Sequence, residues 1–123
     1  MAAGFKELDK VVTLADQMQS DEGPIVLINH FTVAQEDEDA LLKAWAHDAD
    51  FMKQQPGYIS TQLHQGLAGS SSFINYAIWQ DVETFRNAFT NPEFQRRIAE
   101  YPASAEASPH LFRKIAVTNH CVT

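Results

Sequence analysis

The chain has 123 residues, of which 45% are hydrophobic and 20% charged, and its formal net charge is -7 with no cluster of Lys or Arg. This length suits one ordinary domain, and the acidic balance argues against a protein that binds nucleic acid through the phosphate backbone. No apolar run approaches the roughly 20 residues that cross a bilayer, and the single cysteine, Cys121, cannot form an intrachain disulfide, so we expect a cytoplasmic protein without a membrane role.

The first segment, residues 5–18, places apolar side chains at helical spacing with charged residues between them. This pattern predicts an amphipathic helix, which ends in the polar stretch QSDEGP. We therefore divide the chain into an N-terminal helical extension, residues 1–22, and a main domain, residues 23–123.

The main domain begins with IVLINHFTV, residues 25–33, whose β-branched and aromatic residues predict a strand. A helix is expected over 37–54, where an apolar stripe starts after an acidic run and stops at Pro56-Gly57. YISTQLHQG and FINYAIWQ then predict two strands of a hairpin around the loop LAGSSS.

The C-terminal third predicts two short helices and a last strand. Asp81 is expected to cap a helix that runs to Phe89, and Asn91-Pro92 to start another that reaches about Tyr101. The final strand is expected in HLFRKIAVTNHCV, residues 110–122. The order strand, helix, strand, strand, helix, strand is typical of an α+β, ferredoxin-like split βαβ fold, an antiparallel sheet with helices on one face.

The other face of this sheet is predicted to be apolar as well, because it would carry Val26, Ile28, Tyr76 and Ile78. A contiguous apolar patch on a protein of this kind usually contacts another protein. We therefore expect a homodimer in which two sheets pack face to face.

Two amides stand on strand faces that are otherwise apolar. Asn29 shares a face with Leu27 and Phe31, while Asn75 and Trp79 share a face with Phe73. Burying an amide without a partner costs on the order of 1 to 3 kcal/mol. Either the fold satisfies these amides internally, or water or a ligand does.

Several kinds of site find no support in the sequence. The five histidines show no i, i+4 pair and no Cys/His cluster typical of a metal site. Neither a G-x-S-x-G turn nor a glycine-rich loop between a strand and a helix occurs. We therefore expect no metal and no dinucleotide cofactor.

Three stretches, INHFTV, FMKQQPGYISTQLHQ and INYAIWQDVETFRNAF, together resemble the antibiotic biosynthesis monooxygenase (ABM) family over residues 24–117. The resemblance implies a ferredoxin-like domain that forms a dimeric α+β barrel. Within the family the chain is similar to the small anthrone oxygenases of aromatic polyketide pathways, which use molecular oxygen and no cofactor to make a quinone.

Those oxygenases use an asparagine on the first strand and an asparagine four residues before a tryptophan on the third. The matching positions here are Asn29, Asn75 and Trp79. The resemblance implies that the two amides bind the keto and phenol oxygens of an aromatic substrate, and that Trp79 positions it or stabilises charge. The residues expected as aromatic walls of the pocket are Trp45, Phe51, Phe85 and Phe89.

Two other functions fit the same resemblance. Haem-degrading relatives carry a similar asparagine and tryptophan, but they bind iron through a histidine on the helix after the third strand, and NPEFQRRIAEYP has none. Haem binding would then need His47 or His110 to reach the pocket. A non-catalytic dimeric module that binds a small molecule is the third possibility. The base of an oxygenase stays open between water, His47 and no dedicated group.

Overall fold

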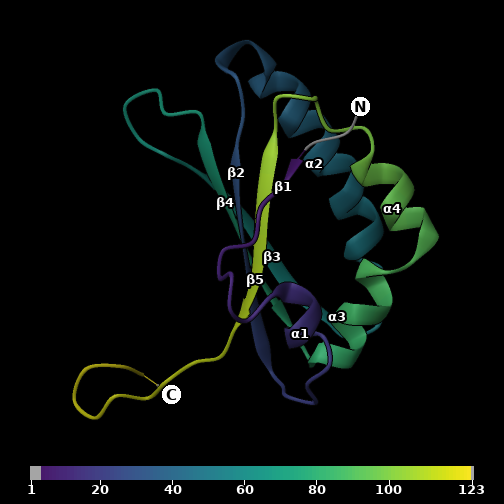
Figure 1. Ribbon diagram of the computed structural model, residues 1–123. Coiled ribbons are helices and arrows are strands. Elements are labelled where there is room, and N and C mark those ends of the chain that lie inside the picture. The colour runs from purple at the N-terminus through teal and green to yellow at the C-terminus, as the bar shows by residue number, and fades with distance from the viewer. Residues whose placement is uncertain (1–3, 123) are drawn as a thin grey trace.

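Residues 4–122 are described in a computed structural model, in which one five-stranded sheet carries helices on one of its faces (Figure 1). The strands follow the order β1-β5-β2-β4-β3; β1 is parallel to β5 and every other neighbouring pair is antiparallel. The strands are β1 (Gly4–Phe5), β2 (Ile25–Thr32), β3 (Tyr58–Gln65), β4 (Ser72–Trp79) and β5 (Glu106–Phe112).

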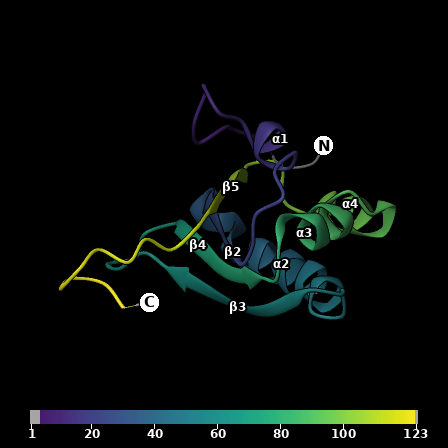
Figure 2. The same cartoon turned by 90° about the horizontal axis from the view of Figure 1, so that it is seen from below.

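The helices α2, α3 and α4 cover one face of this sheet, and α1 lies beside β5 (Figure 2). The helical elements are α1 (Leu14–Gln17), the 3-10 turn η1 (Gln35–Asp37), α2 (Glu38–Met52), α3 (Val82–Phe89) and α4 (Pro92–Ile98). The predicted α+β ferredoxin-like sheet with helices on one face is therefore confirmed. In the described part of the chain no helix is both long and apolar enough to cross a membrane.

Local side-chain chemistry explains where α3 and α4 begin. The Asp81 carboxylate accepts the Thr84 backbone N–H at 2.8 Å, which satisfies a donor that the first turn of α3 leaves free. The Asn91 side chain accepts the Glu93 N–H at 2.8 Å, and Pro92 occupies the first turn of α4. α4 ends at Ile98, before the predicted Tyr101, whose buried ring packs into the core instead.

The long amphipathic helix predicted for residues 5–18 is wrong. Gly4–Phe5 pair with β5, and only Leu14–Gln17 are helical. The Asp9 carboxylate accepts the N–H groups of Val11 and Val12 at 2.9 and 3.1 Å, so a local turn replaces helical bonding there. Thr13 then caps the short α1.

The prediction for the last strand is also wrong in its bounds. β5 runs from Glu106 to Phe112, and residues 113–122 extend away from the sheet (Figure 1). β5 starts four residues before the predicted strand, and Pro109 lies inside it opposite Asn29. Proline is tolerated there because β1 pairs only with Glu106 and Ala107, so one side of β5 lacks a described neighbour at Pro109.

The buried apolar residues form two clusters between the sheet and the helices. One surrounds Trp79 and Phe85, and the other surrounds Phe31, Leu41 and Phe73. The far face of the sheet stays partly open, with Ile74 41% and Tyr76 40% exposed, while Val26, Ile28 and Ile78 are half-buried. The predicted apolar residues therefore lie on the helix-free face along β2 and β4, and polar residues such as Gln62, His64 and His110 flank them on β3 and β5.

Candidate functional site

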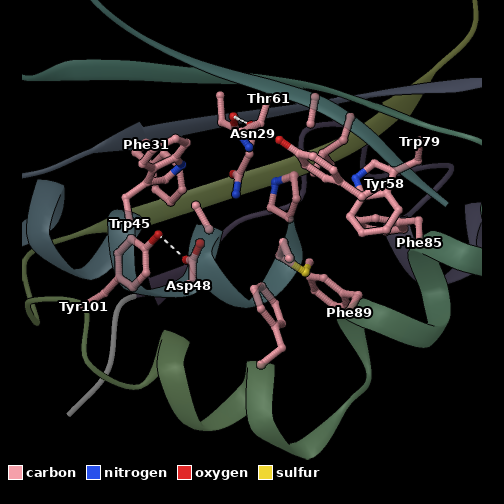
Figure 3. A pocket seen from close by; sticks show the side chains of 17 residues that line it. Asn29, Phe31, Trp45, Asp48, Tyr58, Thr61, Trp79, Phe85, Phe89 and Tyr101 are labelled. Atoms are coloured by element: carbon pink, nitrogen blue, oxygen red, sulfur yellow. Dashed lines mark hydrogen bonds between the residues drawn. The ribbon is translucent and has the colours of Figure 1, made fainter. Parts of the chain in front are cut away.

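A cavity lies between the sheet and the helices, and its lining takes residues from both core clusters (Figure 3). It has an inner part of about 50 Å³ and an outer part of about 270 Å³. Together these parts reach the lower end of the range for small-molecule pockets, roughly 300 Å³. The residues common to both parts are Asn29, Phe31, Asp48, Phe89, Phe94, Tyr101 and Pro109.

Asn29 and Asn75 meet at the sheet side of this cavity. The two residues are direct partners across the antiparallel β2–β4 ladder, and both line the inner part. Side chains paired in this way on one face lie about 5 Å apart at Cβ. The structure therefore brings the two predicted amides together, so that one small ligand could contact both.

The Asn75 side chain is already bonded on its oxygen. The Thr61 hydroxyl, from β3, donates to Asn75 Oδ1, and the described residues contain no acceptor for the Asn75 amide N–H₂ group. The bond leaves those N–H groups available to donate to a ligand in the cavity that Asn75 lines. Thr61 was not predicted from the sequence, because it is brought to Asn75 only by the register of the β3–β4 hairpin.

The Asn29 side chain differs from Asn75 in that its oxygen is unpaired. Its Oδ1 is buried and has no hydrogen-bond partner among the residues that the structure describes. Such atoms are rare in folded proteins because an unpaired buried acceptor costs free energy. In Figure 3 the Asn29 side chain extends from the sheet toward the helices, into the cavity that it lines.

Trp79 forms a fixed wall at one end of the cavity. Its side chain is 1% exposed, and its ring meets Tyr58 and Phe85 edge to face, both at 5.7 Å between centroids. Packed on two sides in this way, the indole cannot change its rotamer without displacing the core. Its role in the geometry is to shape the pocket.

Three of the four predicted aromatic walls line the cavity, namely Trp45, Phe85 and Phe89. Phe51 does not; its ring stacks against Phe94 at 6.4 Å, and the Arg97 guanidinium lies 5.8 Å from its centroid. The helix α2 turns Trp45 and Met52 to the cavity, which leaves Phe51 on the flank that faces α4. Phe94 stands in the lining instead.

Asp48 is a second cavity residue that was not predicted from the sequence. Its side chain lies in the cavity lining at only 8% exposure, and its Oδ2 accepts the Tyr101 hydroxyl at 2.5 Å. The missed signal is its position on the apolar stripe of α2, four residues after Ala44 and three after Trp45. A carboxylate on the face of a helix that packs against the core is unusual, because Asp is rarely buried unless it is paired.

Burial raises the pKa of Asp48 from its ordinary 3.8 to about 7. The Tyr101 hydrogen bond and the charges of His47 and Arg97 oppose this rise, while the charge of Glu100 adds to it. Burial and the neighbouring Asp48 charge also raise the pKa of Tyr101, so Tyr101 stays protonated and donates. The Asp48 carboxyl therefore exchanges its proton near neutral pH.

The sequence that builds this fold and cavity matches a known protein family. The family model described as antibiotic biosynthesis monooxygenase matches residues 24–100. The chain belongs to this family. It is 30% identical to deoxynogalonate monooxygenase of Streptomyces nogalater over 97 residues, which cover 79% of this chain and 80% of that protein.

Solved structures of family members share the fold. SnoaB, a cofactor-independent oxygenase from Streptomyces nogalater, is 25% identical with a TM-score of 0.67, and the match covers 82% of this chain and 100% of SnoaB. A putative monooxygenase from Shewanella loihica PV-4 is 36% identical with a TM-score of 0.66, over 78% and 97% of the two chains. The ABM model ends at residue 100, so Tyr101 and β5 complete the cavity from outside the matched range.

The histidines considered for an ABM site do not line this cavity. His47 lies on the outer side of α2, where its Nδ1 pairs with Glu100 at 2.8 Å. His110 is buried on the other face of β5 and contacts the Gln17 amide at 3.1 Å. Within residues 4–122 no group of three or more His, Cys, Asp or Glu side chains could hold a metal ion.

Proposed function

We propose that this ABM-family protein is a cofactor-independent monooxygenase that oxidises an anthrone-like or hydroquinone-like aromatic polyketide to a quinone with molecular oxygen. The observation that carries the proposal is the pair Asn29 and Asn75, two amides that line a cavity with aromatic walls. The similarity to SnoaB and to deoxynogalonate monooxygenase supports it.

The two amides suit the two kinds of oxygen that an anthrone carries. The Asn75 N–H groups donate to the keto oxygen, while the unpaired Asn29 Oδ1 accepts a hydrogen bond from a neighbouring phenol hydroxyl. Aromatic rings such as Phe31 and Phe89 offer flat surfaces for the fused rings of the substrate.

This arrangement lowers the barrier to the first chemical step. Loss of a proton from the central methylene spreads negative charge onto the keto oxygen, where an N–H donor stabilises it. Removing one donor of this kind typically slows a reaction by roughly 100- to 1000-fold. The resulting carbanion is a strong enough reductant to react with oxygen directly, so the protein needs only to bind and orient it.

We also propose that two chains form a homodimeric barrel through the helix-free face of the sheet. Ile74 and Tyr76 are exposed there, and Val26, Ile28 and Ile78 add apolar surface between them. Packing two such faces together removes this surface from water.

The test of the proposed activity is oxygen-dependent quinone formation from anthrone by the purified protein, with a chelator present and no haem added. Acceleration over buffer that is lost in Asn75→Ala supports the proposal. The matched control is Asn87→Ala, because Asn87 is an exposed asparagine of α3 outside the cavity.

A further inference from the structure

We infer that Asp48 is the catalytic base of the oxygenation and that Tyr101 is the positioning residue that holds its carboxylate in the cavity. This inference rests on the proposed function, because it assigns the proton acceptor for the same site. His47 is not suited to this role, since its ring pairs with Glu100 away from the cavity.

The placement of Asp48 opposite the two amides is the first argument. Asn29 and Asn75 come from the sheet, whereas Asp48 comes from α2 on the other side of the cavity (Figure 3). In an anthrone the keto carbon and the reactive methylene lie at opposite ends of the middle ring. A keto oxygen bound at the sheet therefore directs the methylene toward the helices, where Asp48 lies.

The hydrogen bonding of Asp48 is the second argument. Tyr101 occupies Oδ2, and no hydrogen bond to Oδ1 is found within the described residues. Tyr101 is itself held in place, because its ring stacks on Phe31 at 5.5 Å with an angle of 12° between planes. One carboxylate oxygen is thus anchored and the other is left for a ligand.

A purely structural role explains this carboxylate poorly. A buried carboxylate with one neutral donor is costly, and an amide or an apolar side chain usually serves packing better. The charged neighbours do not bond to it either: Arg97 bonds Glu93 at 2.8 Å and the His47 carbonyl at 2.7 Å, and Glu100 pairs with His47. Asp48 therefore keeps the high proton affinity that suits a general base near neutral pH.

The reaction balances with Asp48 as the proton carrier and oxygen as the oxidant. Asp48 takes a proton from the methylene C–H bond, and the electron pair stays on the substrate as the enolate. The enolate passes one electron to O₂, and the carbon radical and superoxide combine into a peroxide anion, which takes the proton back from Asp48. Asp48 then takes the second C–H proton, the C=O bond forms, and the O–O bond breaks to release hydroxide, which takes that proton from Asp48 and leaves as water.

The test compares Asp48→Asn with the wild-type protein, using anthrone as substrate across a range of pH. For the wild type, kcat/KM should rise with pH and level off above about 7, where Asp48 is ionised. Asp48→Asn should lower kcat/KM at pH 7 by roughly 100- to 10,000-fold, the usual contribution of a general base, and should lose this rise. The control Asp50→Asn removes an exposed carboxylate of the same helix and should leave the rate unchanged.

Two further readouts separate a base from a structural residue. At a pH high enough to ionise anthrone in solution, the Asp48→Asn rate should return to within a few-fold of wild type, because the proton is already gone. Anthraquinone should bind both proteins equally, as measured by quenching of tryptophan fluorescence. Tyr101→Phe should move the rise in kcat/KM to higher pH, because the Tyr101 hydrogen bond lowers the pKa of Asp48.

The inference is overturned if Asp48→Asn keeps the wild-type rate and pH profile, or if its deficit is the same with ionised anthrone. A wild-type protein that does not accelerate quinone formation at all would instead overturn the proposed function on which the inference rests. The two failures are therefore distinguishable in one set of measurements.

Discussion

Asn29 and Asn75 are paired across β2 and β4 inside the cavity, yet only one of them has its side-chain oxygen satisfied by the protein. The Thr61 hydroxyl donates to Asn75, whereas Asn29 Oδ1 is buried without a partner. A polar group left unpaired in a core lowers stability, and proteins retain such groups mainly at functional sites. This asymmetry leads to different predictions for the two residues.

Asn29→Ala is expected to slow quinone formation without lowering stability. The substitution removes an unpaired buried acceptor, so the free energy of unfolding should stay equal or rise by up to about 1 to 3 kcal/mol. With 1,8-dihydroxyanthrone as substrate the rate should fall about tenfold or more, because a phenol hydroxyl of the substrate loses its acceptor. Urea unfolding and initial rates measure the two effects, and a clear loss of stability would mean that Asn29 serves the fold.

Asp48→Asn should change how stability depends on pH. The folded protein binds the Asp48 proton more tightly than the unfolded chain, with a pKa of about 7 against 3.8. Stability of the wild type therefore falls as pH rises from about 4 to about 7, by an amount on the order of 4 kcal/mol from this group, and is constant above that range.

The Asp48→Asn variant has no carboxyl proton at this position, so its unfolding free energy should not decrease in this way between about pH 4 and pH 7. The difference in unfolding free energy between variant and wild type should accordingly increase from pH 4 to pH 7 and then level off. Urea unfolding of both proteins at several pH values measures this difference. A difference that is constant with pH would contradict the raised pKa of Asp48.

Phe89 and Phe51 form a matched pair for testing which aromatic rings contact the substrate. Phe89 lines both parts of the cavity, while Phe51 packs against Phe94 outside it. Phe89→Leu should raise KM several-fold, and Phe51→Leu should leave KM unchanged while costing about 1 kcal/mol of stability. Equal effects on KM would show that the lining does not define the binding site.

The helix-free face supplies a prediction about assembly. Tyr76→Lys introduces a charge at an exposed position in the middle of this apolar face, next to Ile28 in the β2–β4 register. Light scattering during gel filtration should give a dimer mass for wild type and a monomer mass for the variant. A wild-type monomer at micromolar concentration would contradict the proposed barrel.

The central elements were predictable because their residues carry strong local signals. β2 and β4 are rich in β-branched and aromatic residues, and Asp81 and Asn91 cap α3 and α4 as expected. Alternation along β2 and β4 also indicated which residues share a strand face with each amide. That both faces meet and line one cavity comes from the register of the sheet and the position of the helices, which no local pattern contains.

The remaining features depend on contacts between distant segments. The first half of β5 contains Pro and several small residues and carries no strand pattern of its own. It forms a strand because β2 pairs with it along its whole length. The Asp48–Tyr101 hydrogen bond joins residues 53 positions apart, so no local sequence pattern predicts it. In the N-terminal segment, apolar spacing predicted a helix, but Asp9 and Thr13 bond the backbone locally and delay it to Leu14.

The most direct test of the proposed function is the rate of anthraquinone formation from anthrone in air, with chelator present and no haem, for wild type, Asn75→Ala and Asn87→Ala. We predict that wild type and Asn87→Ala accelerate the reaction equally over buffer, and that Asn75→Ala is slower by roughly 100-fold or more. A wild-type rate equal to that of buffer, or a rate that Asn75→Ala leaves unchanged, would contradict it.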